Sequence, residues 1–221
     1  MMHNILITGS TGMTGRLALE KCLSLPTVTK VTTITRKKSD FSHPKLTEII
    51  HSDFLDFTSI EDKLQGHNAC IYCLGVYTGQ VGKEEFRKIT TDYTRAFAEA
   101  IHNANEKMVI SFLSGQGADS SEKSMVMFAR DKGAAENSLL QQGFEKVYIF
   151  RPGYIYPVRE RQEPNFSYKL MRKLYKPIST IFPNIGLTSE HLAHAMVEVT
   201  LKGGEKAIYE NKDIRDIKIT I

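Results

Sequence analysis

The chain has 221 residues, of which 41% are hydrophobic and 24% are charged. This is an ordinary globular composition, and the length is sufficient for one good core. The net charge of +4 and the pI near 8.8 are only mildly basic, and we find no basic stripe with interleaved aromatic residues, so we expect no nucleic-acid partner. No signal peptide precedes the first predicted strand, and no apolar run reaches the roughly 18 residues that a bilayer requires, so we expect no membrane partner. Three cysteines, an odd number, favour reduced thiols and a cytoplasmic location.

The strongest signal in the sequence is a glycine-rich turn near its start. Residues 5–7 form a short apolar run that predicts a buried strand, and the apolar spacing of residues 13–25 predicts a helix. Gly9, Gly12 and Gly15 lie between and at the start of these elements, at three-residue intervals. A strand, a glycine turn and a helix bring backbone N–H groups and the positive end of a helix dipole to one place. That arrangement suits the pyrophosphate of a dinucleotide.

Each glycine has a predicted role in such a turn. Gly9 allows the tight turn, Gly12 allows the backbone to approach the phosphates, and Gly15 allows the helix to pack on the strand. The turn residues predicted to bind the cofactor are Gly9, Ser10, Thr11, Gly12, Met13, Thr14 and Gly15. The spacing G-x-x-G-x-x-G has one residue more in its first gap than G-x-G-x-x-G. It is not a P-loop, because no lysine followed by serine or threonine comes after it, and Arg16 does not replace that lysine.

The second predicted strand points to the identity of the dinucleotide. Residues 30–36 are rich in β-branched side chains, and the basic triplet Arg36-Lys37-Lys38 ends the run. Arg36 follows Gly15 by about 20 residues, where the adenosine ribose lies in dinucleotide-binding folds. An acidic residue there would bind the 2′-hydroxyl and repel a 2′-phosphate, whereas Arg36 can pair with a phosphate. We therefore expect NADP rather than NAD; the alternative is that Arg36 belongs to a solvated basic turn.

A third strand is predicted at residues 46–50, followed by a short helix at residues 58–64. Asp53, just past the strand, could accept a hydrogen bond from the adenine amino group, with Phe54 packing nearby. The alternative for Asp53 is an ordinary turn aspartate.

The fourth predicted strand, residues 69–74, is apolar throughout, which predicts a central position in a parallel sheet. Its end, Cys73-Leu74-Gly75, is predicted to bring backbone beside the cofactor. Cys70 and Cys73 form a C-x-x-C within this strand. A redox pair needs a helix N-terminus, and a zinc site needs a second pair of ligands, so we interpret both as small core residues.

The alternation of helices and strands continues to residue 152. The predicted elements are a helix at 84–104, a strand at 108–113, a helix at 124–142 and a strand at 147–150. Ser114 follows the strand at 108–113, at the edge where open α/β sheets bind ligands, and Pro152 is predicted at the cofactor site after the last strand. This alternation predicts a doubly wound parallel sheet of the Rossmann type.

Beyond Arg151 the pattern changes. We expect one domain, with a dinucleotide-binding core at 1–152 and a small C-terminal substrate lobe and tail at 153–221 that complete it. The predicted segments are a loop at 154–164, a basic helix at 165–174, an irregular stretch at 177–186, a helix at 189–201 capped by Ser189, and one or two strands within 207–221. Six aromatic residues here are expected mostly to pack this lobe: Tyr154, Tyr156, Phe166, Tyr168, Tyr175 and Phe182. His191 and His194 share a helix face but lack a third ligand, so no metal site is predicted.

Together these motifs resemble an atypical short-chain dehydrogenase/reductase, of the small NAD(P)-binding branch that includes the Tat-interacting oxidoreductase-like proteins. The resemblance covers nearly the whole chain. Its carriers are T-G-S-T-G-M-T-G at 8–15, Arg36, C-L-G at 73–75, L-S-G-Q-G-A at 113–118, Lys132-Gly133 with Glu136, R-P-G at 151–153 and the tail at 210–216.

The resemblance implies hydride transfer between nicotinamide and a carbonyl or alcohol. In the family a tyrosine moves the proton, a lysine four residues later holds the ribose and lowers the phenol's pKa, and a serine binds the substrate oxygen. Lys132 fits the lysine and Ser114 fits the serine, although Gly115 replaces a second serine often found there. The tyrosine position is Phe128, and none of the nine tyrosines has a lysine four residues on. A phenyl ring cannot carry the proton.

Three functions are compatible with these residues. The first is an NADP-dependent oxidoreductase with weak or unconventional turnover, whose proton comes from Ser114, Tyr77, Tyr154 or water. The second is a non-catalytic protein that senses NADP(H) and regulates or binds a partner. The third, with little support, is binding of a nucleotide sugar or another nucleotide on the same sheet. The substrate, any protein partner and the oligomeric state are not determined by these residues.

Overall fold

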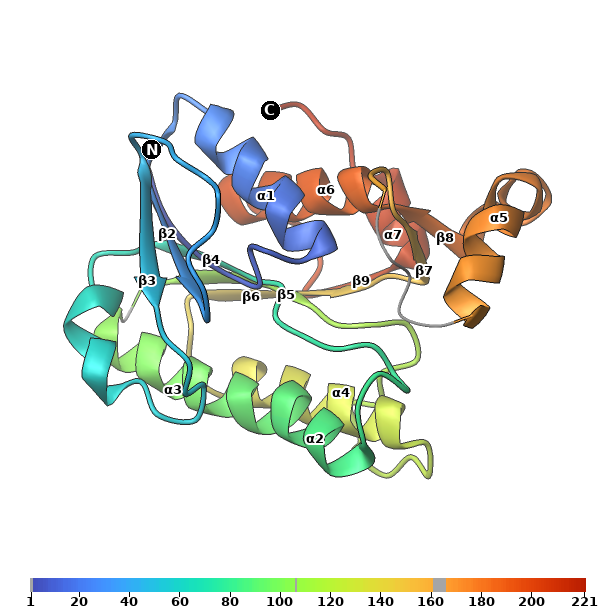
Figure 1. Ribbon diagram of the computed structural model, residues 1–221, viewed down its shortest axis with the longest axis horizontal. Coiled ribbons are helices and arrows are strands. Elements are labelled where there is room, and N and C mark those ends of the chain that lie inside the picture. Colours follow the sequence, from blue (N-terminus) through green and yellow to red (C-terminus); the bar gives the residue numbers. More distant parts are fainter. Residues whose placement is uncertain (1, 106, 161–165) are drawn as a thin grey trace.

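A parallel sheet of seven strands forms the centre of the protein (Figure 1). The computed structural model describes residues 2–105, 107–160 and 166–221. In order across the sheet the strands are β3 (Leu46–Ile50), β2 (Val28–Thr35), β1 (His3–Thr8), β4 (Ala69–Tyr72), β5 (Val109–Leu113), β6 (Lys146–Arg151) and β9 (Ile208–Glu210). Every neighbouring pair is parallel. The predicted doubly wound α/β fold is confirmed, with the apolar strand β4 between β1 and β5.

Helices cover both faces of this sheet (Figure 1). On one face lie α1 (Met13–Ser24) and α6 (Ser189–Lys202); on the other lie α2 (Lys83–Arg87), α3 (Tyr93–Ala104) and α4 (Met127–Leu140), with the 3-10 helix η1 (Thr58–Leu64). A hydrophobic core lies on each face of the sheet, and strand β1 contributes side chains to both. Ile5 and Ile7 pack beneath α1, whereas Leu6 packs on the opposite face. A strand covered on both faces must be apolar at successive positions, which explains the run at 5–7.

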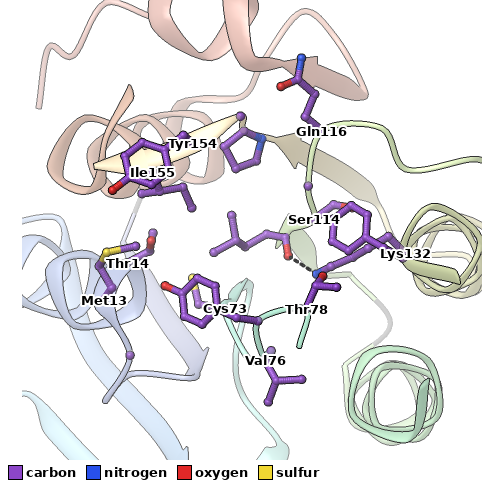
Figure 2. Close-up of a pocket in the computed structure, with 18 of the residues that line it drawn as sticks. Met13, Thr14, Cys73, Val76, Thr78, Ser114, Gln116, Lys132, Tyr154 and Ile155 are labelled. Carbon is purple, nitrogen blue, oxygen red and sulfur yellow. Dashed lines mark hydrogen bonds between the residues drawn. The ribbon is translucent and has the colours of Figure 1, made fainter. Parts of the chain in front are cut away.

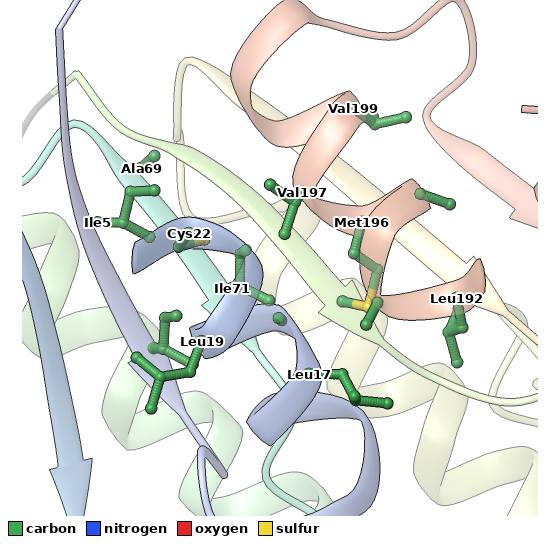
Figure 3. Packing of buried hydrophobic residues seen from close by; sticks show 14 of the residues in the cluster. Ile5, Leu17, Leu19, Cys22, Ala69, Ile71, Leu192, Met196, Val197 and Val199 are labelled. Atoms are coloured by element: carbon green, nitrogen blue, oxygen red, sulfur yellow. The ribbon is translucent and has the colours of Figure 1, made fainter. Parts of the chain in front are cut away.

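The core beneath α1 unites the two ends of the chain (Figure 3). Helices α1 and α6 pack against each other. Cys22 of α1 and Met196 of α6 are fully buried in the same core as Ile5 and Ile71 of the sheet. The helix that follows the glycine turn is therefore held in place by residues from near the C-terminus.

The strand order reverses at β1, which creates the place for a ligand. From β1 the chain passes to β2 on one side, and it later returns to β4 on the other side. Loops that follow β1 and β4 consequently diverge and leave a crevice at the carboxyl ends of these strands. Open α/β sheets bind their ligands in such crevices.

The helix predicted at 84–104 is present but interrupted. It consists of α2, one π-helical segment η2 (Lys88–Asp92) and α3. At this wider segment Thr91 Oγ1 donates a hydrogen bond to Asp131 O of α4 at 3.1 Å. The interruption lies where the helix contacts α4, and apolar spacing along one helix did not reveal it.

The segment after Arg151 differs most from prediction. Part of the predicted loop at 154–164 forms β7 (Tyr154–Tyr156), which pairs in parallel with β8 (Gly186–Thr188) as a second small sheet; residues 161–164 lie outside the described residues. Helix α5 (Phe166–Ile181) continues past the predicted end at 174 and through Pro177, and the 3-10 helix η3 (Pro183–Ile185) follows. Strands of three residues carry no readable periodicity, which is why β7 and β8 were missed.

The last elements correct the predicted cap of α6 and confirm a strand in the tail. The side chain of Thr188, not Ser189, caps α6 by accepting a hydrogen bond from His191 N at 3.1 Å. In the tail only one strand, β9, is present, and helix α7 (Asn211–Asp216) follows it. Glu210 and Asp213 form a reciprocal capping box that starts α7, a local signal from which this helix was predictable. Within the described ranges, no helix combines the length and apolar character needed to cross a bilayer.

Candidate cofactor site

A cavity of about 580 Å³ opens at the carboxyl ends of β1, β4, β5 and β6 (Figure 2). The predicted site residues that line it are Gly12, Met13, Thr14, Gly15, Cys73, Leu74, Gly75, Ser114, Phe128, Lys132 and Pro152. Gly9, Ser10 and Thr11 precede these residues in the same turn but are not part of the lining. Parallel strands place these distant stretches at one edge of the sheet, so a single cavity contains residues from the glycine turn and from α4.

Two glycines in the turn are packed too closely to carry a side chain. Gly9 has a φ of +68°, and a Cβ on it would lie 2.5 Å from the carbonyl carbon of Cys73. A Cβ on Gly15 would lie 2.2 Å from the carbonyl oxygen of Gly9. Gly12 is exposed, and its N–H donates to Gly9 O at 2.9 Å. The start of α1 is thus held close against the ends of β1 and β4, which leaves its free N–H groups near the cavity.

The residues predicted for the adenosine end lie outside the cavity. Arg36 is exposed just after β2, and it makes no ion pair or side-chain hydrogen bond with the described part of the chain. Asp53 is also exposed, and its Oδ1 accepts a hydrogen bond at 3.0 Å from the backbone N–H two residues later. Phe54 is buried, with its ring centroid 5.8 Å from that of Phe57. Phe54 is therefore a core residue in this structure, and cofactor contact stays a prediction for Arg36 and Asp53.

Phe128, at the expected tyrosine position, lies against Gly115. Both residues line the cavity, and a Cβ on Gly115 would lie 2.7 Å from Phe128 Cζ. The sequence departs from the family pattern at these two positions, and the structure shows that the departures are in contact. A glycine at position 115 leaves the space that the phenyl ring occupies.

Behind the cavity, a buried ion pair holds Ser114. Ser114 Oγ donates a hydrogen bond to Glu136 Oε1 at 2.5 Å. Arg151 Nε donates to the same oxygen at 3.0 Å, and its Nη2 donates to Oε2 at 2.5 Å. The Glu136 side chain is fully buried, and Arg151 also pairs with Glu210 at 3.0 Å. Hydrogen bonding to Glu136 raises the pKa of Arg151 above its already high usual value.

Lys132 follows Phe128 by one turn of α4 and also lines the cavity. Its Nζ donates to Leu113 O at 3.4 Å (Figure 2) and lies 5.5 Å from the centre of the Phe112 ring. Burial lowers the pKa of Lys132 to about 8, although the nearby Glu136 and Cys73 act in the opposite direction. An ammonium group with this pKa can exchange a proton near neutral pH.

The outer wall of the cavity was predicted only in part: Tyr77 and Tyr154 were considered as cleft tyrosines, whereas Ile155 and Met171 were not and Tyr168 was expected to pack the lobe. Tyr154 and Ile155 of β7 line it, together with Tyr168 and Met171 of α5. Tyr77, in the loop after β4, meets Tyr168 with ring centroids 5.0 Å apart. Ile155, Tyr168 and Met171 carry no motif, and only the fold of the C-terminal segment brings them to the cavity.

The expectation that the C-terminal aromatic residues mostly pack the lobe holds only in part. Tyr156 and Tyr175 stack with centroids 4.8 Å apart, as packing residues do. Tyr154 and Tyr168 line the cavity instead, and Phe182 is exposed. The side chain of Phe166 lies outside the described ones.

The cysteines and histidines form no further site in the described residues. Cys70 is buried in the core below the sheet, whereas Cys73 lies at the cavity; positions three apart in a strand face opposite sides, so the pair cannot close. Burial raises the pKa of the Cys73 thiol to about 12, and all three cysteines are free thiols. Among the residues that the structure describes, no cluster of three or more potential ligands could hold a metal ion.

Comparison with known proteins identifies the family. A family model described as NAD(P)H-binding matches residues 9–200. The chain belongs to this NAD(P)H-binding family.

The chain is also similar in sequence to named proteins from other organisms. Protein HTATIP2 of Rattus norvegicus is 29% identical over 175 residues, which cover 78% of this chain and 70% of the rat protein. Protein fmp52, mitochondrial, of Emericella nidulans is 32% identical over 169 residues, which cover 74% and 71% respectively. The crystal structure of a short chain dehydrogenase family protein from Francisella tularensis shares the fold, with a TM-score of 0.64 at 14% identity, covering 98% of this chain and 100% of that one. The predicted resemblance is confirmed: the chain is similar to the HTATIP2 and fmp52 proteins, and its fold is that of a short chain dehydrogenase family structure.

The same comparisons correct the predicted location. The Emericella relative and two other fungal relatives are named mitochondrial proteins, which contradicts the expectation of a cytoplasmic protein. The expectation rested partly on unpaired cysteines. Free thiols indicate a reducing environment, and more than one compartment provides that.

Proposed function

We propose that the protein binds NADP(H), with the pyrophosphate at the turn of residues 9–15 and the nicotinamide near Lys132. The observation that carries this proposal is the cavity at the switch point of the sheet, lined both by the start of α1 and by Lys132. The N-terminus of α1 offers backbone N–H groups and a positive dipole end, and its first turn contains no acidic residue. An anionic pyrophosphate is therefore favoured there.

The preference for the 2′-phosphate rests on Arg36. Its guanidinium group is exposed at the carboxyl end of β2, beside β1 in the sheet. A charge-assisted hydrogen bond contributes about 1.5–3 kcal/mol, which is roughly 10–100-fold in affinity.

We expect NADPH to bind at least about tenfold more tightly than NADH, and Arg36→Glu to abolish that preference. Fluorescence titration of both dinucleotides measures it. Lys107→Glu is the control. It makes the same charge change at an exposed position just before β5, at the amino ends of the strands and so away from the cavity, and it should leave the preference intact. A clear preference of the unaltered protein for NADH would refute the role of Arg36, and failure to bind either dinucleotide would refute the proposed function.

For the reaction, we propose slow hydride transfer to an uncharged carbonyl substrate, or from the corresponding alcohol. The cavity lining is largely apolar and aromatic, with Phe128, Ile155, Tyr168 and Met171, and Lys132 is the only charged side chain among the described lining residues. A nucleotide sugar would bring a second diphosphate without a further cation to receive it, so that ligand is disfavoured.

Phe128→Tyr tests the cause of slow turnover. A phenol one turn before Lys132 would supply the family's proton donor, and general acid catalysis contributes about 10²–10⁴-fold, so we expect NADPH oxidation with a carbonyl panel to accelerate by at least about tenfold. Phe128→Leu, which adds no hydroxyl, is the matched control and should not accelerate it. Rapid reduction by the unaltered protein, with no gain from tyrosine, would sink the idea of an impaired mechanism.

The second candidate function is a non-catalytic NADP(H) sensor that regulates or binds a partner. The observation in its favour is Phe128, because the turn and Lys132, which we propose bind the cofactor, are present at the cavity while a phenyl ring occupies the position expected for the proton donor. Tight NADPH binding with no turnover by either the unaltered protein or Phe128→Tyr would favour the sensor.

A further inference from the structure

Phe128 stands where the family has its tyrosine and cannot protonate the reacting oxygen, so another group must supply that proton. The donor must lie within hydrogen-bond reach of that oxygen, at the part of the cavity where Ser114, Phe128 and Lys132 meet. Tyr154 lies across the cavity from Lys132 and Ser114 (Figure 2).

Tyr77 and Thr78 also line the cavity. The Tyr77 ring packs against Tyr168 of the outer wall, and the Thr78 hydroxyl, which lies beside Lys132 in Figure 2, is an alcohol and a much weaker acid than an ammonium group. The two remaining candidates are the Ser114 hydroxyl, which the family uses to bind the reacting oxygen, and the Lys132 ammonium.

The hydrogen bonds around Ser114 weigh against it as the donor. A carboxylate paired with arginine through both oxygens can only accept hydrogen bonds, so the 2.5 Å contact with Glu136 uses the Ser114 proton. Giving that proton to a substrate would leave a buried carboxylate oxygen with one partner fewer. Ser114 can still offer its oxygen lone pairs to the cavity.

Lys132 is placed differently. Its Nζ contacts the carbonyl oxygen of Leu113, the residue directly before Ser114, so an oxygen atom bound near Ser114 is also near this ammonium. Of its three N–H donors, one makes this long 3.4 Å contact, and no other hydrogen bond or ion pair of Nζ is formed within the described ranges. The remaining N–H groups are available to a molecule in the cavity.

We propose that Lys132 Nζ, and not Ser114, delivers the proton to the reacting oxygen, while the Glu136–Arg151 pair holds Ser114 as a hydrogen-bond acceptor. This inference rests on the proposed function, and it assigns the lysine the task that the family gives to tyrosine.

The charges around Lys132 are compatible with that task. Glu136 follows it by one turn on α4, but Arg151 of β6 neutralises that carboxylate. Cys73 faces it from the end of β4 as a protonated thiol, since burial raises the thiol pKa to about 12. Burial therefore dominates and lowers the pKa of Lys132 to about 8, so the group is mostly protonated at neutral pH yet releases its proton readily.

The step balances with NADPH as the hydride source. A C–H bond of the reduced dinucleotide breaks and its hydrogen moves with both electrons to the carbonyl carbon, where a new C–H bond forms. The π electrons of the carbonyl move to oxygen, and that oxygen takes a proton from Lys132 as the N–H bond breaks. The products are the alcohol, oxidised dinucleotide and a neutral amine, which regains its proton from water.

Lys132→Arg is the main test, because arginine keeps the positive charge but does not release a proton near neutral pH. NADPH binding is measured by fluorescence, and NADPH oxidation is followed with uncharged aldehydes and ketones from about pH 6 to about pH 10. We expect binding to change by no more than about threefold and turnover to fall by at least about 100-fold. The rate of the unaltered protein should fall as the pH rises through about 8. Lys123→Arg, at an exposed position before α4, is the control.

A readout that needs no substrate is the melting temperature of Lys132→Met as a function of pH. The folded-state pKa of Lys132, about 8, lies below its ordinary value of 10.5, so the protonated lysine destabilises the folded protein below pH 8, and this penalty fades as the pH rises from 8 to 10.5. Lys132→Met should melt above the unaltered protein at pH 7, and the difference should shrink across that window.

The outcomes separate the two proposals. If Lys132→Arg keeps the rate and pH profile, if the methionine variant shows no pH-dependent difference, or if the unaltered protein binds NADPH but reduces no member of the panel, the proposal for Lys132 is overturned and NADP(H) binding stands. If the unaltered protein does not bind NADPH, both proposals fail.

Discussion

Replacing Glu136 with alanine is expected to lower the free energy of unfolding by about 3–5 kcal/mol, because removal of one partner of a buried ion pair leaves the other charge uncompensated. The Glu136 side chain is 0% exposed and that of Arg151 is 11% exposed, so water cannot replace the lost carboxylate easily. Ser114 would lose its acceptor at the same time. For a domain of this size the corresponding fall in melting temperature is roughly 6–20 °C.

Thermal and urea unfolding measure this effect. Glu99→Ala on the neighbouring helix α3 is the matched control, since Glu99 is exposed and forms no ion pair or side-chain hydrogen bond with the described residues; its effect should stay within about 0.5 kcal/mol. Glu136→Gln keeps the shape and one oxygen acceptor and should fall between the two. A loss below about 1 kcal/mol for Glu136→Ala would mean that the pair does not stabilise this edge of the sheet.

Gly15→Ala is expected to weaken NADPH binding by at least about 100-fold and to destabilise the fold by about 1–3 kcal/mol. The new Cβ would lie 2.2 Å from Gly9 O and 3.2 Å from Cys73 Cβ, so α1 has to move away from the turn. The loss should occur even though alanine is favoured over glycine inside a helix by about 1 kcal/mol. Displacing the start of α1 removes the N–H groups from the pyrophosphate position.

Fluorescence titration and thermal unfolding of the same samples check both parts. Gly82→Ala is the control: it precedes α2, its φ is negative, and a Cβ there meets no atom within 4 Å. It should leave binding unchanged. If Gly15→Ala binds NADPH like the unaltered protein, the pyrophosphate does not lie at this turn.

The central sheet could be predicted from the sequence because each strand carries a local signal. Residues 46–50 were predicted as a strand with the bounds of β3, and the strand at 69–74 contains β4 with its central position. Both faces of the inner strands are covered by helices, so their residues are apolar in succession and are recognisable without any knowledge of their partners. Strands β7 and β8 lack that signal, because three residues that pair with a distant segment leave no pattern in the chain.

Some residues of the candidate site also carry a signal in the sequence, whereas their contacts with distant residues do not. The glycine turn was predicted from its spacing and Ser114 from its place after a strand, whereas the role of Lys132 was implied by the family resemblance; all except residues 9–11 of the turn line the cavity. Glu136 follows Lys132 on the same helix and was noted in the motif, yet its contact with Ser114 joins α4 to β5 and is not encoded by spacing. Phe54 shows the opposite case: it follows a strand end at a suitable place, but its aromatic neighbours enclose it in the core.

The sequence by itself determined what kind of molecule this protein is built to hold: the glycines require a close turn, the apolar runs require a buried parallel sheet, and Phe128 removes the family's proton donor. Only the tertiary structure decided how the remaining groups are used. It commits the Ser114 proton to Glu136, places Lys132 beside it, and closes the cavity with β7 and α5. The physical reason is that local patterns record which face of an element is buried, whereas hydrogen bonds and charges between distant elements exist only after the chain has folded.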